Sequence, residues 1–376
     1  MTDQKRRCMA AGWSDLPSPL LELIACRLPI DDLIDIDDLI SFGLTCSHWR
    51  NVVVRLQGSF RRRISVPWLM ITDWRRPESC SCFSLRQRGF YEFPLPHVRD
   101  KRRCLSSRGW VMTIGRDRDV QMFNPLSRAR ACIQLSALQP HCSPPQGPIH
   151  NEQIGKFALS ACPYSSEKSE IMILSDIDRR LALWNYRDRS WTMVSPHRIY
   201  MDLIYYEGRF LAVDAMGTIR AFPVELDGLH PDADGQVVAR RPCGLVDLRH
   251  FKKHYLVECW GSLLVVSQEW RRGFVTSGFQ AFLLDLEAST WTRVGSLGDR
   301  SLFLGLNSSF SMEITDRHGG IEPDCIYFTD DCTNLYSEGK DMGIYHMADG
   351  RIDPLLFEGM PDCPNSAPLW IEPNAG

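Results

Sequence analysis

The sequence contains no long apolar run. None of its apolar stretches approaches the ~18 residues that a membrane-spanning helix needs. The basic residues Lys5, Arg6 and Arg7 are not followed by the apolar segment of a secretion signal. We therefore expect a soluble, intracellular protein without a membrane partner.

An excess of one charge sign is also missing. The formal net charge of -3 over 376 residues argues against a dedicated nucleic-acid-binding protein. Basic runs at residues 5–7, 61–63 and 99–103 are short, and runs of this kind usually form solvated surface. Because the first run is compatible with nuclear import, we expect a location in the nucleus, the cytoplasm or both, and no nucleic-acid partner.

The cysteines show neither a disulfide framework nor a zinc pattern. The 14 cysteines are scattered singly through apolar stretches, which is typical of small buried residues in a reducing compartment. Cys80 and Cys82 form a close pair, but no second cysteine or histidine pair stands at zinc spacing. We therefore predict no metal site and no cofactor.

Compact catalytic motifs are absent as well. The sequence contains no G-x-S-x-G, H-E-x-x-H or G-x-x-x-x-G-K-[ST] arrangement. Asp330 and Asp331 are typical of a turn rather than of two carboxylates held at a defined separation. An enzyme is the rival interpretation, but these observations favour a protein without catalytic residues.

Apolar residues recur at helical spacing near the N-terminus. Leu20, Leu21, Ile24 and Leu28 form one stripe of a helix that Pro17 is suited to open. Two further apolar sets follow, at residues 33–40 and 42–56. Three short helices of roughly 45 residues bury too little surface to be robust alone. The remaining apolar face should dock onto a partner helix, or the helices cap the rest of the chain.

This segment resembles an F-box. The resemblance rests on Leu16-Pro17, Ile24, Leu28, the spacing Asp38…Phe42…Cys46 and the run from Cys46 to Arg50. It implies binding to the Skp-type adaptor of a cullin-RING ubiquitin ligase, through Leu16, Pro17, Leu20, Ile24, Leu28 and Trp49. Packing of Trp49 within the helices is the alternative. The tetrapeptide Asp-Asp-Leu-Ile occurs twice, which lengthens the middle of the motif relative to the family pattern.

Beyond about residue 65 the chain changes to short apolar runs separated by turn residues, a pattern typical of antiparallel strands. A loose repeat occurs six times, with anchors at Phe83, Phe123, Trp184, Phe222, Leu284 and Tyr345. Their spacing of roughly 40 or 60 residues fits four-stranded propeller blades with some insertions. We predict about six blades, with five or seven as alternatives because the fourth repeat is degenerate.

Each unit also contains an apolar hairpin, with Gly109, Gly208 or Gly261 at the turn, and these strands should be the inner ones. Blades stack radially, so large aromatic residues fill the space between them. We therefore expect Trp184, Trp191, Trp260 and Trp291 to belong to the core, not to a ligand cage.

The C-terminal half is similar to a large plant family of F-box proteins with a kelch-like domain. The similarity rests on residues 301–311, 324–331 and 343–345. The predicted fold class is α+β, with a disordered segment at 1–12, an F-box of three helices at 13–57 and a mainly β propeller at 65–370. The resemblance implies a substrate-recognition subunit of an SCF ubiquitin ligase, which holds an adaptor and a client protein. The alternative is a propeller interaction scaffold.

The client surface is expected on loops of the propeller. Trp270 beside two arginines has the composition of an interface hot spot, with an exposed hairpin tip as the alternative. The candidate client-binding residues are Trp270, Arg271, Arg272, Arg317, His318, Asp330 and Asp331.

Overall fold

A computed structural model of the chain describes residues 12–28, 41–61, 66–72, 79–94, 101–115, 120–123, 133–135, 154–161, 169–176, 178–185, 190–195, 197–223, 235–241, 252–271, 275–305, 307, 309–316, 318–329, 341–355 and 368–373. The chain divides into two compact units, Met1–Val66 and Pro67–Gly376. Within the described ranges, no helix has the length and apolar character of a membrane span. The segment predicted to be disordered lies outside these ranges except for Gly12.

Short helices build the first unit. They are η1 (Trp13–Asp15), α1 (Ser18–Arg27) and α3 (Ser47–Arg61), and residues 41–44 are also helical. Pro17 opens α1, because its carbonyl accepts the N–H groups of Leu20 and Leu21 at 3.0 and 3.2 Å. Leu21 and Ala25 are fully buried where α1 packs on α3. The second predicted apolar set, at residues 33–40, lies outside the described residues.

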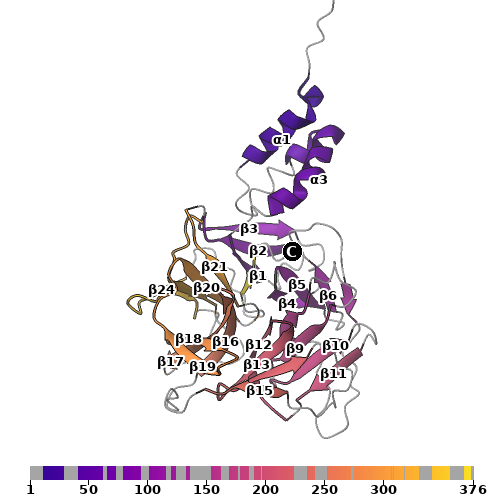
Figure 1. The fold of residues 1–376 in the computed structure, drawn as a ribbon. Helices are drawn as coiled ribbons and strands as arrows, with labels where there is room; N and C mark the ends of the chain where they lie inside the picture. The colour runs from indigo at the N-terminus through magenta and orange to yellow at the C-terminus, as the bar shows by residue number, and fades with distance from the viewer. Residues whose placement is uncertain are drawn as a thin grey trace, which may run out of the picture. The chain divides into compact units, whose positions relative to one another are not determined.

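Strands build the second unit, and in its described part they form six sheets arranged as the blades of a β-propeller (Figure 1). Blade one consists of β25 (Leu369–Ile371), β1 (Trp68–Thr72), β2 (Ser79–Ser84) and β3 (Gly89–Pro94). Blade two consists of β4 (Lys101–Ser107), β5 (Trp110–Gly115), β6 (Val120–Phe123) and β7 (Ile133–Leu135). Blade three consists of β8 (Ile154–Leu159), β9 (Ile171–Ser175), β10 (Leu181–Asn185) and β11 (Ser190–Val194).

The remaining blades follow along the chain. Blade four consists of β12 (Tyr200–Tyr206), β13 (Arg209–Asp214), β14 (Ile219–Pro223) and β15 (Gln236–Ala239). Blade five consists of β16 (Lys252–Cys259), β17 (Ser262–Arg271), β18 (Val275–Asp285) and β19 (Thr290–Val294). Blade six has the order β21 (Phe310–Glu313), β20 (Arg300–Leu304), β22 (Cys325–Phe328), β23 (Gly343–His346) and β24 (Ile352–Pro354), with β20 and β22 parallel. The prediction of six blades is confirmed.

The edge strands β4, β8, β12, β16, β21 and β25 form the centre of the propeller. Around the ring they follow one another in the order β25, β4, β8, β12, β16 and β21, and each contacts the next. Strand β25, close to the C-terminus, pairs with β1 in the register Leu369↔Met70, so the last strand of the chain completes the first blade. This pairing gives the first blade its innermost strand and closes the ring.

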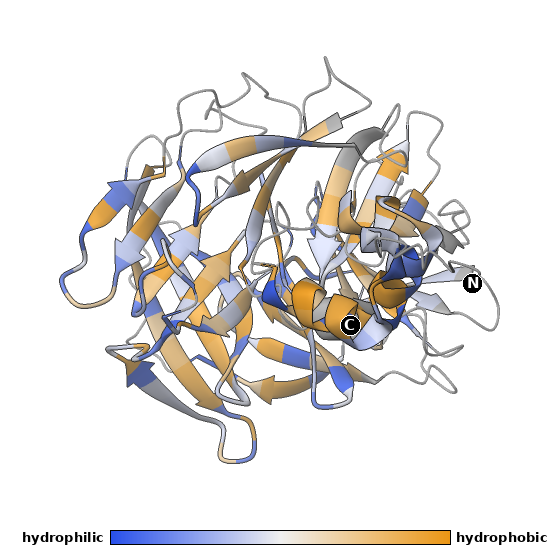
Figure 2. Cartoon of the chain, turned by 90° about the horizontal axis from the view of Figure 1, so that it is seen from above, coloured by the Kyte–Doolittle hydropathy of each residue, from blue (hydrophilic) through white to orange (hydrophobic). Residues whose placement is uncertain are grey.

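The predicted hairpins are confirmed at β4–β5, β12–β13 and β16–β17. Each has two turn residues with positive φ, as in Glu207 and Gly208 (46° and 78°) or Trp260 and Gly261 (54° and 70°). This is the geometry of a type I′ turn, whose twist matches that of the paired strands. Figure 2 shows the propeller strands largely in hydrophobic colours and several connecting turns in blue.

The core of the second unit lies between adjacent blades. Trp184 and Trp191 pack with Phe157 of the same blade and Trp110 of blade two, as predicted. Trp291 is partly buried against the cluster between blades four and five. The prediction for Trp260 is wrong, since its side chain is 45% exposed. Trp260 occupies the turn after β16 rather than a strand position, which leaves its side chain more exposed than Trp184 and Trp191.

Candidate functional site

A cavity of about 390 Å³ opens at the centre of the propeller. Its walls come from β4, β8, β12, β16 and β21, together with Glu372 directly after β25. Because these five strands and Glu372 belong to six different blades, no single repeat forms the site.

A buried ion pair holds one wall of the cavity. Lys156 Nζ on β8 lies 2.5 Å from Asp202 Oδ1 on β12, and the two side chains are 7% and 3% exposed. The second oxygen, Asp202 Oδ2, accepts the backbone N–H of Leu256 on β16 at 2.7 Å. Three neighbouring blades are therefore linked through one carboxylate, which keeps the wall in a single arrangement.

Two hairpin turns contribute side chains at the cavity. Arg108, the first turn residue after β4, lies over the ring of Tyr205, with its guanidinium carbon 5.8 Å from the ring centre. Trp260 lines the cavity from the turn after β16. That turn is held by Tyr206, whose hydroxyl donates to the Gly261 carbonyl at 2.9 Å. Exposed Trp, Tyr and Arg are the residue types enriched in binding hot spots.

Glu372 adds an unusual carboxyl group to the cavity. Burial raises its pKa to about 7, with Arg108 opposing this shift and the carboxylate of Glu258 adding to it. Near neutral pH the Glu372 side chain is therefore present both as a donor and as a charged acceptor. The cavity consequently offers cationic groups and a carboxyl group that changes its charge in the physiological range.

Two polar atoms at the cavity have no hydrogen-bond partner among the residues that the structure describes. They are Asn307 Oδ1 and Ser309 Oγ, both buried at the atom level, in the segment between β20 and β21. Leaving a buried polar group unpaired costs about 1–3 kcal/mol unless water or a ligand satisfies it. These atoms therefore favour a polar occupant with hydrogen-bonding groups of its own.

The first unit presents a different surface. Leu20, Leu23 and Ile24 of α1 are 47%, 59% and 38% exposed, although all three are apolar. Pro17 is exposed, and Leu16 and Leu28 are half-buried. Five of the six predicted adaptor residues therefore lie in α1 or next to its ends, whereas Trp49 lies on α3. Leu23 joins the exposed residues of α1 although the sequence pattern did not single it out.

Trp49 has a role within the first unit. Its ring lies 4.3 Å from the ring of Phe42, and its Nε1 donates to the Trp13 carbonyl at 3.2 Å. The neighbouring His48 Nε2 lies 3.0 Å from the Leu16 carbonyl. These contacts support the alternative that Trp49 packs within the helices and fixes the segment before α1.

Three of the seven predicted client residues lie in the described part of the chain. Trp270 is half-buried and Arg271 is exposed near the end of β17. His318 is buried, and its Nδ1 accepts the N–H of Thr315 at 2.9 Å, so the ring belongs to the hydrogen bonding of its own loop. Arg272, Arg317, Asp330 and Asp331 lie outside the described residues. The client-binding roles stay predictions.

The sequence analysis missed the main residues of the cavity: Arg108, Asn307, Ser309 and Glu372. The Gly109 hairpin was a usable signal for Arg108, since the residue before such a glycine stands on a turn. Asn307 and Ser309 stand within the segment 301–311 that carries the family similarity, but nothing in that segment marked them as cavity residues. No local signal marked Glu372, because the pairing of β25 with β1 brings it to the centre.

The fold and its surfaces define a class of protein: a six-bladed propeller preceded by a helical unit with exposed apolar residues. Residues 82–346 match the KIB1-4 beta-propeller family, and the chain belongs to that family.

Curated proteins from Arabidopsis thaliana are similar to this chain over most of its length. F-box protein At4g35733 is 23% identical, covering 94% of this chain and 97% of the relative. Putative F-box protein At3g25750 is 25% identical over 90% and 92% of the two chains. F-box protein SKIP23 is 24% identical over 96% of each. With the family match, these similarities support a plant F-box protein with a propeller domain, and they imply a role in protein interaction.

Proposed function

We propose that the chain is the substrate-recognition subunit of an SCF ubiquitin ligase. The first unit binds a Skp-type adaptor, and through it a cullin, while the propeller binds a client protein. The chain performs no bond chemistry itself. Its contribution is tethering, which raises the local concentration of client lysines near the charged ubiquitin-conjugating enzyme.

The observation that carries this proposal is the apolar surface of α1. Leu21 and Ala25 are buried, whereas Leu20, Leu23 and Ile24 are exposed on the same helix. Burying one Leu or Ile side chain contributes about 1.5–3 kcal/mol. A partner that covers these side chains therefore gains substantial affinity, as in helix-in-groove recognition. The similarity to F-box proteins over nearly the whole chain supports a Skp-type adaptor as that partner.

The test is adaptor binding by the intact chain and by a charged variant. A Leu20→Asp/Ile24→Asp protein should bind a plant Skp-type adaptor at least 100-fold more weakly, which corresponds to losing about 3 kcal/mol. Ile199→Asp is the matched control, because Ile199 is a 60% exposed aliphatic residue of the propeller. The control should bind normally in the same surface plasmon resonance assay.

Equal binding by the charged variant and the control would exclude α1 as the adaptor surface. If the intact chain does not bind the adaptor, the ligase proposal is replaced by the alternative, an interaction scaffold whose N-terminal helices only cap the propeller.

On the client side, the central cavity is the surface that we propose for recognition. Trp260 and Arg108 supply anchors, and the unpartnered Asn307 and Ser309 atoms supply polar contacts. Proximity labelling in plant cells should show client proteins that are lost with Trp260→Ala but kept with Trp13→Ala, an equally drastic change at a 75% exposed tryptophan of the first unit. An unchanged set of labelled proteins would point instead to loops such as that beside Trp270 and Arg271.

A further inference from the structure

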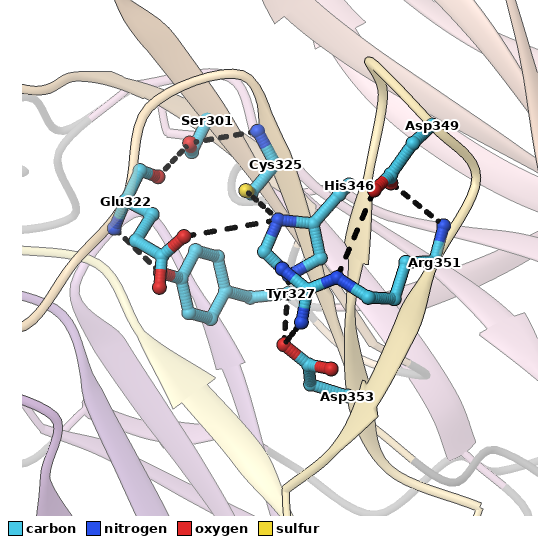
Figure 3. Close-up of polar contacts among 8 residues, drawn as sticks. All are labelled: Ser301, Glu322, Cys325, Tyr327, His346, Asp349, Arg351 and Asp353. Carbon is cyan, nitrogen blue, oxygen red and sulfur yellow. Dashed lines mark hydrogen bonds and ion pairs between the residues drawn. The ribbon is translucent and has the colours of Figure 1, made fainter.

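Three side chains of metal-binding type meet in blade six (Figure 3). Glu322 lies in the segment before β22, Cys325 begins β22, and His346 ends β23. Their possible ligand atoms all lie within 4.8 Å of one another, and this is the one such group of His, Cys, Asp or Glu in the described residues. None of the three lines the central cavity.

The spacing of the atoms suits a tetrahedral ion. His346 Nδ1 lies 3.4 Å from Cys325 Sγ and 3.7 Å from Glu322 Oε2. Zinc binds sulfur at about 2.3 Å and nitrogen or oxygen at about 2.0–2.2 Å, so its ligands stand about 3.3–3.6 Å apart. Small side-chain adjustments are sufficient to reach this geometry, and Glu322, with a side chain 63% exposed, leaves a path for an ion to enter.

The imidazole of His346 is oriented for such a role. Its Nε2 lies 3.0 Å from Asp353 Oδ2. The same Asp353 oxygen also accepts a hydrogen bond from Arg351 Nη1, which keeps the carboxylate in the role of an acceptor. The proton of a neutral imidazole is therefore on Nε2, which leaves the lone pair of Nδ1 facing Cys325 and Glu322. A carboxylate behind a ligand histidine is the usual outer partner in zinc sites.

The backbone around the group is held without an ion. Ser301 Oγ donates to the Glu322 carbonyl at 2.6 Å and accepts the Cys325 N–H at 3.2 Å. The Glu322 N–H donates to the hydroxyl of Tyr327 at 2.7 Å. Glu322 and Cys325 are therefore kept close to His346 by neighbouring strands, and binding would require little ordering of the chain.

Charge around the sulfur also favours a cation. The carboxylates of Glu322 and Asp324 place negative charge near the Cys325 sulfur. A divalent ion opposes the same negative field, because a thiolate and a carboxylate together balance its two charges. Without an ion, the thiol donates a weak hydrogen bond to His346 Nδ1, which is the competing explanation for the cluster.

We propose that Glu322 Oε2, Cys325 Sγ and His346 Nδ1 bind a zinc ion, with water at the fourth position. Binding forms a zinc–sulfur bond and releases the thiol proton to solvent. Asp353 is a positioning residue, and the ion ties the segment before β22 to β23. This proposal departs from the sequence-based prediction of no metal site, which considered only closely spaced cysteines and histidines.

The experiment uses the purified full-length chain, freed of metal by a chelator and titrated with Co²⁺ and then Zn²⁺. One equivalent of Co²⁺ should produce a near-ultraviolet sulfur-to-cobalt charge-transfer band together with the visible bands of tetrahedral cobalt, and Zn²⁺ should displace it. Cys325→Ser should lose the charge-transfer band. Asp353→Asn should weaken binding about 10–100-fold without abolishing the band, as is typical of outer partners of metal ligands.

Two further variants keep the test decisive. Glu322→Gln changes an exposed side chain and is expected to fold normally, yet it should weaken Zn²⁺ binding at least 10-fold. Cys259→Ser alters another buried propeller cysteine and should bind like the wild type. The proposal would be overturned if the wild type did not bind one equivalent of Co²⁺, or if Cys325→Ser and Glu322→Gln both bound the ion as tightly as the wild type. The three side chains would then form only a hydrogen-bonded cluster.

Discussion

The Lys156–Asp202 ion pair provides a direct test of how the centre of the propeller is held. Both side chains are less than a tenth exposed, and Asp202 also accepts the N–H of Leu256. Asp202→Asn keeps the shape and an acceptor oxygen but leaves the ammonium group of Lys156 buried without a counter-charge. Breaking a buried pair in this way costs about 3–5 kcal/mol, and we expect a loss of that size in the free energy of unfolding.

The reciprocal variant completes a double-mutant cycle. Lys156→Met should also cost several kcal/mol, whereas Lys156→Met with Asp202→Asn removes both charges and should lose only about 1–2 kcal/mol, close to the value of a hydrogen bond. The assay is urea unfolding followed by near-ultraviolet circular dichroism. Glu313→Gln is the control, because Glu313 Oε2 lies 3.6 Å from Arg300 Nη2 and the Glu313 side chain is 57% exposed. This variant should lower the free energy of unfolding by under about 1 kcal/mol. The reasoning fails if Asp202→Asn is no more destabilising than this control.

Three further outcomes are expected. Trp370→Ala empties a fully buried site in β25 and should lower the free energy of unfolding in urea by about 3–5 kcal/mol. Trp260→Ala, at a 45% exposed turn position, should lower it by under about 1 kcal/mol, and equal losses would contradict the ring-closing role of β25. The folded-state pKa of Glu372 lies above its ordinary value of 4.5, at about 7, so the folded protein holds this proton more strongly and stability falls as pH rises through that window. Glu372→Gln should therefore match the wild type near pH 4.5 and exceed it above pH 7 by about 1–3 kcal/mol, as thermal unfolding at both pH values would show; a pH-independent difference would contradict the assignment. Leu16→Ala with Pro17→Ala should abolish adaptor capture in a pull-down while the β circular dichroism spectrum stays unchanged, and retained capture would count against these residues.

Local patterns were sufficient for much of the fold. The helical spacing of Leu20 and Ile24 predicted α1, because a helix repeats over only a few residues. The glycine-centred hairpins at Gly208 and Gly261 were found for a similar reason, since a two-residue turn with positive φ is specified by the residues at the turn. Periodicity did not distinguish which apolar residues of α1 pack against α3 and which face outward, because both sides of that helix are apolar.

The candidate sites depended on contacts between distant segments. Trp184 was predicted correctly because it stands on a strand between blades, whereas Trp260, at a turn, was not. Glu372 reaches the cavity because β25 pairs with β1 across the whole length of the unit. No local pattern encodes such a pairing, so a search of motifs and spacings misses it.

The sequence by itself determined the helical character of the N-terminal segment and the repeated strand unit, because these features arise from side-chain periods of a few residues. It left five, six or seven blades open, and the strand pairing decided on six. The tertiary structure alone decided which polar groups converge. It placed Lys156 against Asp202, left Asn307 and Ser309 unpartnered at the centre, and brought His346 to Cys325 through the pairing of β22 with β23. The physical reason is that strand pairing and blade packing join residues far apart in the chain, and a site is a property of that closure rather than of any one repeat.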